Sequence, residues 1–261
     1  MKTLRSLTLG CSADKETLTL SRPVPVVEMK SLKTLTIDDH HGAPPSLNGH
    51  LFSALFKSVV APSLWTFKLL CSDSSPDDSL WSTHFTEFLQ HSSASLQTFA
   101  LSIRPCYGHI GRPVSELLAL VPRLKQFDLL VEGRHGMNDM EREVYQGFVE
   151  QLVSLLLSDL RRPEMVPDLE SLSLRIGGID LGPHVVHGIL QLVKSRKPDV
   201  ATPTMGRLRS LRWTKFVSLT SRPSHRIVLG SATVQDMEKL RKDGIHVMIE
   251  ERDRARVHDF E

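Results

Sequence analysis

The chain repeats a six-residue pattern: leucine, two other residues, leucine or phenylalanine, one further residue, and a closing apolar residue. Seven copies begin between residues 4 and 208, at intervals of 28 to 45 residues. They are Leu4–Leu9, Leu32–Ile37, Leu64–Leu69, Leu96–Leu101, Leu124–Leu129, Leu169–Leu174 and Leu208–Trp213. Apolar and other residues alternate in the second half of each copy, which is the period of a β-strand. A short sequence pattern that recurs at such intervals is typical of stacked structural repeats.

The segments between copies are too long for hairpins and fit helical crossovers, so we expect the strands to be parallel. Apolar residues at helical spacing predict helices at 48–59, 81–89, 113–121, 139–160, 183–195 and 233–242. Proline follows several of them just before the next strand, because it disfavours helical geometry in the residue that precedes it. We expect a loop at 215–226 and a last strand at 245–249.

These elements predict an α/β fold, an irregular leucine-rich-repeat solenoid of right-handed sense. Its curved parallel sheet should have about seven or eight strands, with helices on the convex side. Residues 1–250 would form the solenoid and residues 251–261 a charged C-terminal tail. One core level should stack equivalent residues of successive strands, namely Leu35, Phe67, Phe99, Phe127 and Leu172. Cys11 and Cys71 should occupy a neighbouring core position as small buried hydrophobes.

Charge and cysteine content narrow the functional classes. The 32 basic and 30 acidic residues nearly balance, so we expect no nucleic-acid partner, which would need a clustered positive field. The 3 cysteines have no paired spacing, which indicates reduced thiols. No signal peptide and no apolar run long enough to cross a membrane is evident. We therefore expect a cytoplasmic or nuclear protein without a membrane partner.

Residues able to carry chemistry are few and scattered. His184 and His187 are spaced to share one helix face, but no third zinc ligand stands at a typical spacing. His40 and His41 follow a strand in a segment that we interpret as a solvated loop. Common nucleotide-binding, hydrolase and metalloprotease motifs do not occur. We expect no catalytic residue, no metal and no cofactor, and hence no enzyme.

The polar face of the predicted sheet, opposite the helices, is the surface on which we expect a partner to bind. Leu70 and Leu130 each follow an inward-facing leucine by one residue, so their side chains should leave the sheet on the concave face. Arg175 has the same parity, and Arg212 lies one column away. Apolar anchors near arginines are typical of interface hot spots. We therefore predict that a protein partner contacts Leu70, Leu130, Arg175 and Arg212.

Two features of the repeats are characteristic. Phenylalanine often takes the place of the second leucine, and the sequence Pro-x-Leu often precedes the strand. In this the chain resembles the leucine-rich-repeat region of F-box proteins of mushroom-forming fungi, from about Leu4 to Ile249. The resemblance implies a non-catalytic module that recognises a substrate for a ubiquitin ligase. We find no F-box before Leu4, so a Skp-type adaptor is expected only if an F-box lies upstream. The alternative is a free-standing repeat scaffold or inhibitor without a ubiquitin link.

Overall fold

The main sheet of the protein has eight parallel strands that follow one another in chain order. The computed structural model describes residues 4–10, 25–39, 54–71, 83–103, 111–131, 139–162, 164–177, 183–196, 208–217 and 231–253. The strands are β1 (Ser6–Gly10), β3 (Thr34–Asp39), β5 (Thr66–Cys71), β6 (Thr98–Ile103), β7 (Gln126–Val131), β8 (Ser171–Gly177), β9 (Ser210–Val217) and β10 (His246–Asp253). The prediction of an α/β chain with parallel strands is confirmed.

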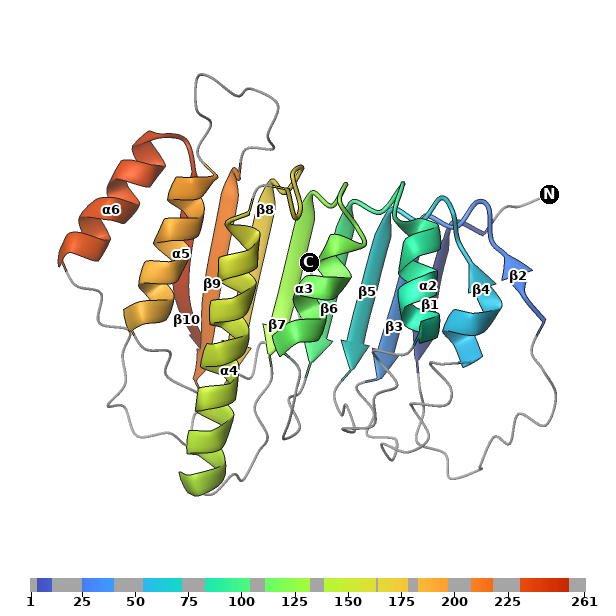
Figure 1. Cartoon of the computed structure of the whole chain (residues 1–261), viewed down its shortest axis with the longest axis horizontal. Coiled ribbons are helices and arrows are strands. Elements are labelled where there is room, and N and C mark those ends of the chain that lie inside the picture. The colour runs from blue at the N-terminus through green and yellow to red at the C-terminus, as the bar shows by residue number, and fades with distance from the viewer. Residues whose placement is uncertain are drawn as a thin grey trace.

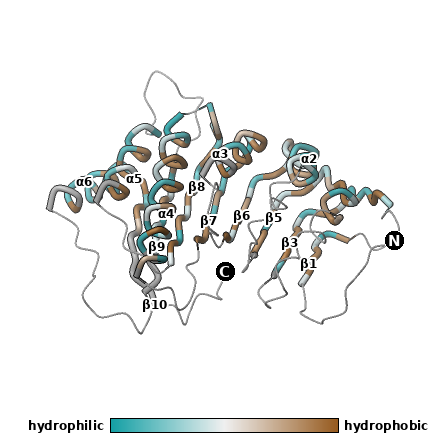
Figure 2. Tube along the Cα trace, turned by 60° about the horizontal axis from the view of Figure 1, so that its bottom comes forward, coloured by the Kyte–Doolittle hydropathy of each residue, from teal (hydrophilic) through white to brown (hydrophobic). Residues whose placement is uncertain are grey.

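Helices form a second layer on one face of this sheet (Figures 1 and 2). They are α2 (Thr83–Ser92), α3 (Gly111–Ala119), α4 (Asp139–Leu160), α5 (Pro183–Ser195) and α6 (Ser231–Lys242). Residues 54–58 are also helical. The predicted helix over 48–59 does not reach its expected end, because Val59–Val60 is the short strand β4. It pairs in parallel with β2 (Val27–Glu28) in a separate two-stranded sheet.

The seven sequence copies lie in register. Equivalent residues face one another across every pair of neighbouring strands, as in the pairs Leu7 with Leu35 and Phe127 with Leu172. The register holds although the connections differ in length, because the backbone ladder and the buried apolar row both require the same alignment. β10 adds an eighth strand in the same register, with Val247 opposite Leu211.

Several strands are preceded by a similar hydrogen-bonded turn. In this turn, the N–H of the first leucine of a copy bonds back three residues, as Leu64 does to Ala61 and Leu124 to Val121, each at 3.1 Å. Proline stands second in these turns, where its fixed φ suits a β-turn. The residue after that leucine then accepts two N–H groups of the next strand, as the Lys33 carbonyl does from Trp65 and Thr66. These prolines thus shape the turn that leads into the next strand.

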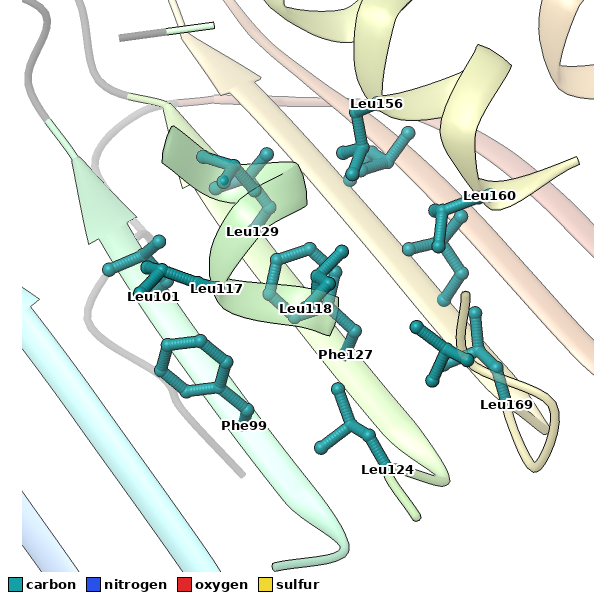
Figure 3. Close-up of a cluster of buried hydrophobic side chains, with 14 of the residues drawn as sticks. Phe99, Leu101, Leu117, Leu118, Leu124, Phe127, Leu129, Leu156, Leu160 and Leu169 are labelled. Atoms are coloured by element: carbon teal, nitrogen blue, oxygen red, sulfur yellow. The ribbon is translucent and has the colours of Figure 1, made fainter. Parts of the chain in front are cut away.

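The core lies between the sheet and the helices. The predicted level of Leu35, Phe67, Phe99, Phe127 and Leu172 is confirmed, since all five side chains are buried and paired in register. The rings of Phe67 and Phe99 stack with centroids 5.7 Å apart and planes 10° apart. Figure 3 shows Leu118 of α3 over Phe127, Leu117 of α3 beside Leu101, and Leu156 and Leu160 reaching in from α4. The next inward level is Ile37, Leu69, Leu101, Leu129 and Leu174, and the one after it contains Ile103, Val131 and Ile176, all of them buried. Cys11 and the Cys71 side chain lie outside the described residues.

Helix α4 packs on a stripe only partly the one that its apolar residues suggest. Helical spacing groups Val144 and Leu155 with Val149, Leu152 and Leu156, but Val144 and Leu155 are exposed. The buried residues instead recur at helical spacing, namely Tyr145, Val149, Leu152, Val153, Leu156, Leu157 and Leu160. Tyr145 replaces Val144 because its ring fills the core side while its hydroxyl donates to the Gly177 carbonyl at 3.5 Å. The apolar residues of α4 therefore exceed what one face can hold.

The C-terminal elements run longer than expected. β9 continues to Val217, inside the predicted loop at 215–226. β10 continues to Asp253, past the expected domain boundary at residue 250, and pairs with β9 along its whole length. Pairing with a neighbour satisfies backbone groups whatever the charge of the side chains, so the charged sequence did not indicate this extension. Gly244 ends the connection after α6 with φ of 79°, as expected for a helix-terminating glycine.

A buried arginine joins two helix ends. The Arg196 guanidinium follows α5 and donates to the carbonyls of Leu160, Arg162 and Val166, at 2.9, 3.3 and 2.6 Å. Leu160 is the last residue of α4, whose final carbonyls have no partner within the helix. Burial lowers the pKa of Arg196, and the Glu164 carboxylate acts in the opposite direction. The charge is thus held by carbonyl dipoles at the negative end of a helix.

Candidate protein-binding face

The sheet face opposite the helices carries three rows of side chains, which we call the open face. The amino row is Ser6, Thr34, Thr66, Thr98, Gln126, Ser171, Ser210 and His246. The middle row is Thr8, Thr36, Lys68, Ala100, Asp128, Ser173, Arg212 and Met248. The carboxyl row is Gly10, Asp38, Leu70, Ser102, Leu130, Arg175 and Thr214. Residues far apart in sequence thus share one surface because the strands are in register.

The four predicted contact residues lie close together on this face. Leu70, Leu130 and Arg175 share the carboxyl row, with Ser102 between the two leucines. Arg212 lies in the middle row on β9, next to the strand that carries Arg175. The row geometry read from the repeats is therefore correct.

The expected exposure of the two leucines is wrong. Leu70 is 5% exposed and Leu130 is 1% exposed, and Ala100 of the middle row is buried too. They do not belong to the main apolar cluster beneath the helices, so they form a separate buried patch on the open face. Strand parity fixes the side on which a side chain leaves the sheet, but not how much solvent reaches it. These leucines are consequently not free anchors for a partner.

Arg175 is held by a carboxylate that the sequence reading did not single out. Its Nε and one terminal nitrogen donate to the two oxygens of Asp128, at 3.1 and 2.7 Å. The side chains are only 12% and 19% exposed, so water screens this pair weakly. A two-point bond fixes the plane of the guanidinium as well as its position. The signal was present in the sequence, because Asp128 and Arg175 fall in adjacent rows of adjacent strands.

Two hydroxyls of the carboxyl row are buried. Neither Ser102 Oγ nor Thr214 Oγ1 has a hydrogen-bond partner among the described residues. A buried hydroxyl without a partner costs stability, so these positions are polar where an apolar residue would be more stable. The carboxyl end of the open face is therefore a mixed, poorly hydrated surface.

Solvent reaches the amino row most easily. Ser6, Gln126 and His246 are exposed there, and the remaining members are partly exposed. Thr36 and Lys68 of the middle row are partly exposed as well. The accessible part of the open face is thus rich in hydroxyl groups and lies nearer the amino ends of the strands.

Features of catalysis or metal binding are sparse in the described part of the chain. No three histidine, cysteine or acidic side chains converge within the described residues. His187 is exposed, and its Nε2 lies 3.3 Å from the Gln191 side-chain nitrogen. The His184 side chain, His40 and His41 lie outside the described residues. No described helix combines the length and the apolarity that crossing a bilayer requires.

No protein-family model, no curated protein and no solved structure matches the chain.

Proposed function

We propose that the chain is a non-catalytic protein-recognition module, an irregular leucine-rich-repeat solenoid that binds a partner on its open face. The observation that carries this proposal is the register of eight parallel strands, which aligns an accessible hydroxyl-rich row along one face. Serine and threonine hydroxyls both donate and accept, so such a row suits the backbone and polar side chains of another protein. In a solenoid of this kind, the sheet forms the concave surface.

The recognition would rest on prearranged groups. The Arg175–Asp128 pair is fixed before binding, because its two-point bond sets both the position and the plane of the guanidinium. Prearranged groups cost little entropy when a partner binds, which favours specific contacts over a large apolar area. The buried leucines would support this surface from within, and would not touch the partner themselves.

Resemblance to fungal F-box proteins favours a substrate receptor of a ubiquitin ligase, acting in the cytoplasm or nucleus. A Skp-type adaptor would join only through an F-box encoded upstream of Met1. The alternative is a free-standing scaffold or inhibitor with the same binding face. The upstream genomic sequence separates the two, because an F-box in the same reading frame is required by the first and not by the second.

Capture of partners with matched variants tests the binding face. The open-face variant combines Lys68→Glu with Gln126→Lys, and the control combines Lys239→Glu with Gln90→Lys on helices α6 and α2. Both variants make the same residue exchanges at solvent-accessible positions, so their net charge is equal. Proteins retained by each immobilised chain from cells of its source are quantified by mass spectrometry.

We expect the open-face variant to lose a partner that the parent and the control retain, by about tenfold or more. Equal retention by all three chains, with unchanged melting, would exclude the open face as the binding surface.

A further inference from the structure

Besides the three rows of the open face, a further row of side chains lies just before the strands, where each copy of the repeat enters the sheet. This strand-entry row is Arg5, Lys33, Trp65, Gln97, Lys125, Glu170 and Arg209. Its backbone is continuous across the sheet, because the carbonyl of each residue accepts the N–H of the next member, at 2.7 to 2.9 Å. Equivalent backbone positions place the side chains side by side, about 4.8 Å apart along the row.

The charges of this row are balanced at one end and not at the other. Glu170 lies 3.6 Å from the Lys125 ammonium and 3.8 Å from the Arg209 guanidinium. Arg5 and Lys33 are exposed, and neither forms an ion pair with a carboxylate in the part of the chain that the structure describes. Arg5 and Lys33, at the β1 and β3 end of the row, therefore present positive charge without a carboxylate partner among the described residues, whereas Lys125 is paired with Glu170.

A large aromatic side chain lies next to these two cations in the row. Trp65 is 50% exposed, between Lys33 on one side and Gln97 on the other. The exposed half of the indole is apolar surface left in water, which is unfavourable. Tryptophan with neighbouring cations is the composition that dominates the energetics of protein interfaces.

We propose that the strand-entry row from Arg5 to Gln97 docks an extended acidic peptide segment of a partner protein, with an apolar residue of that segment on Trp65. Four strand spacings separate Arg5 from Lys125, about 19 Å. An extended peptide covers that span with about six residues. Carboxylates of the segment would then meet Arg5 and Lys33, and the segment would end before Lys125, which is already paired with Glu170.

The row fits a peptide better than a nucleic acid. Trp65 is the one aromatic residue in the strand-entry row, whereas unspecific single-strand binding uses successive stacking aromatics. Glu170 stands further along the row and would repel a continuing phosphate backbone. A short peptide segment can end before it reaches the Glu170 carboxylate.

A random heptapeptide display library selected on the purified full chain tests the proposal. Enriched peptides are synthesised with a fluorescent label, and their binding is measured by anisotropy at two salt concentrations. We expect net negative peptides with an apolar residue next to acids, bound more weakly as salt increases. Trp65→Ala and Lys33→Glu should each weaken binding by about tenfold or more. The charge-matched Lys239→Glu variant on α6 should bind as the parent does.

Several results would overturn the proposal. Selection without an acidic bias, or an affinity that neither Trp65→Ala nor Lys33→Glu changes, would remove the row as a peptide site. Tighter binding of a labelled thymidine oligonucleotide than of any selected peptide would assign the row to nucleic acid instead. Both substitutions are at exposed positions, and matching thermal melts of parent and variants verify that folding is retained.

Discussion

At the scale of single residues, the side that a side chain faces was predictable and its exposure was not. Alternation placed Phe99 in the core and Leu130 on the open face, and the strand register agrees for both. Leu130 is nevertheless buried, because exposure depends on every group nearby in space, including groups distant in sequence. Arg175 was singled out from its parity alone, while its partner Asp128 needed the geometry of two neighbouring strands. The candidate site was therefore predictable as a set of rows, but not as a set of accessible groups.

Phe99→Ala should destabilise the protein by about 3–5 kcal/mol, since it removes a ring buried between two others and leaves a cavity. Denaturant unfolding of parent and variant gives this difference. Phe148→Ala is the matched control, because the same atoms are removed from a partly exposed position on α4. It should cost clearly less. A loss below about 0.5 kcal/mol for Phe99→Ala would mean that the aromatic level does not hold the core together.

At the scale of helices and strands, boundaries were predictable where a local signal marks them. The bounds 139–160 and 183–195 were read from apolar spacing and agree with α4 and α5. The end of β10 carries no such signal, since its extension to Asp253 depends on pairing with β9. The tertiary anchor between helix ends was not foreseen either, because nothing near Arg196 in the sequence indicates carbonyls some 30 residues away. Local sequence patterns thus predicted the helices and strands, whereas the contacts between them became known only from the structure.

Arg196→Met should lower the free energy of unfolding by about 2 kcal/mol, because it leaves buried carbonyls at the end of α4 without their donor. Thermal or denaturant melts measure this loss. Arg209→Met serves as the control, since the same exchange is made at an exposed arginine with a 3.8 Å ion pair. That change should stay within about 0.5 kcal/mol. Equal effects of the two substitutions would contradict the role given to the buried guanidinium.

At the scale of the whole molecule, the order of the strands in the sheet is their order in the chain. Each repeat therefore contacts mainly its neighbours, and neighbouring strands come from successive copies of the six-residue pattern. This is why the overall architecture could be predicted from seven short segments: their equivalence fixes parallel direction and register together. The curvature and handedness of a solenoid remain predictions.

The same strand order determines how the molecule should respond to force. β1 and β10 are the two edges of the sheet, so tension applied through the chain ends pulls across the strands and along their hydrogen bonds. In that geometry, the bonds between an edge strand and its neighbour bear the load before the interior ones do. We expect optical-tweezer traces with several small rips, each releasing about one repeat of 28 to 45 residues, in place of a single high-force rupture. A single all-or-none event would show that the repeats yield together. A peeling response would let the protein lengthen under load while its remaining repeats stay folded.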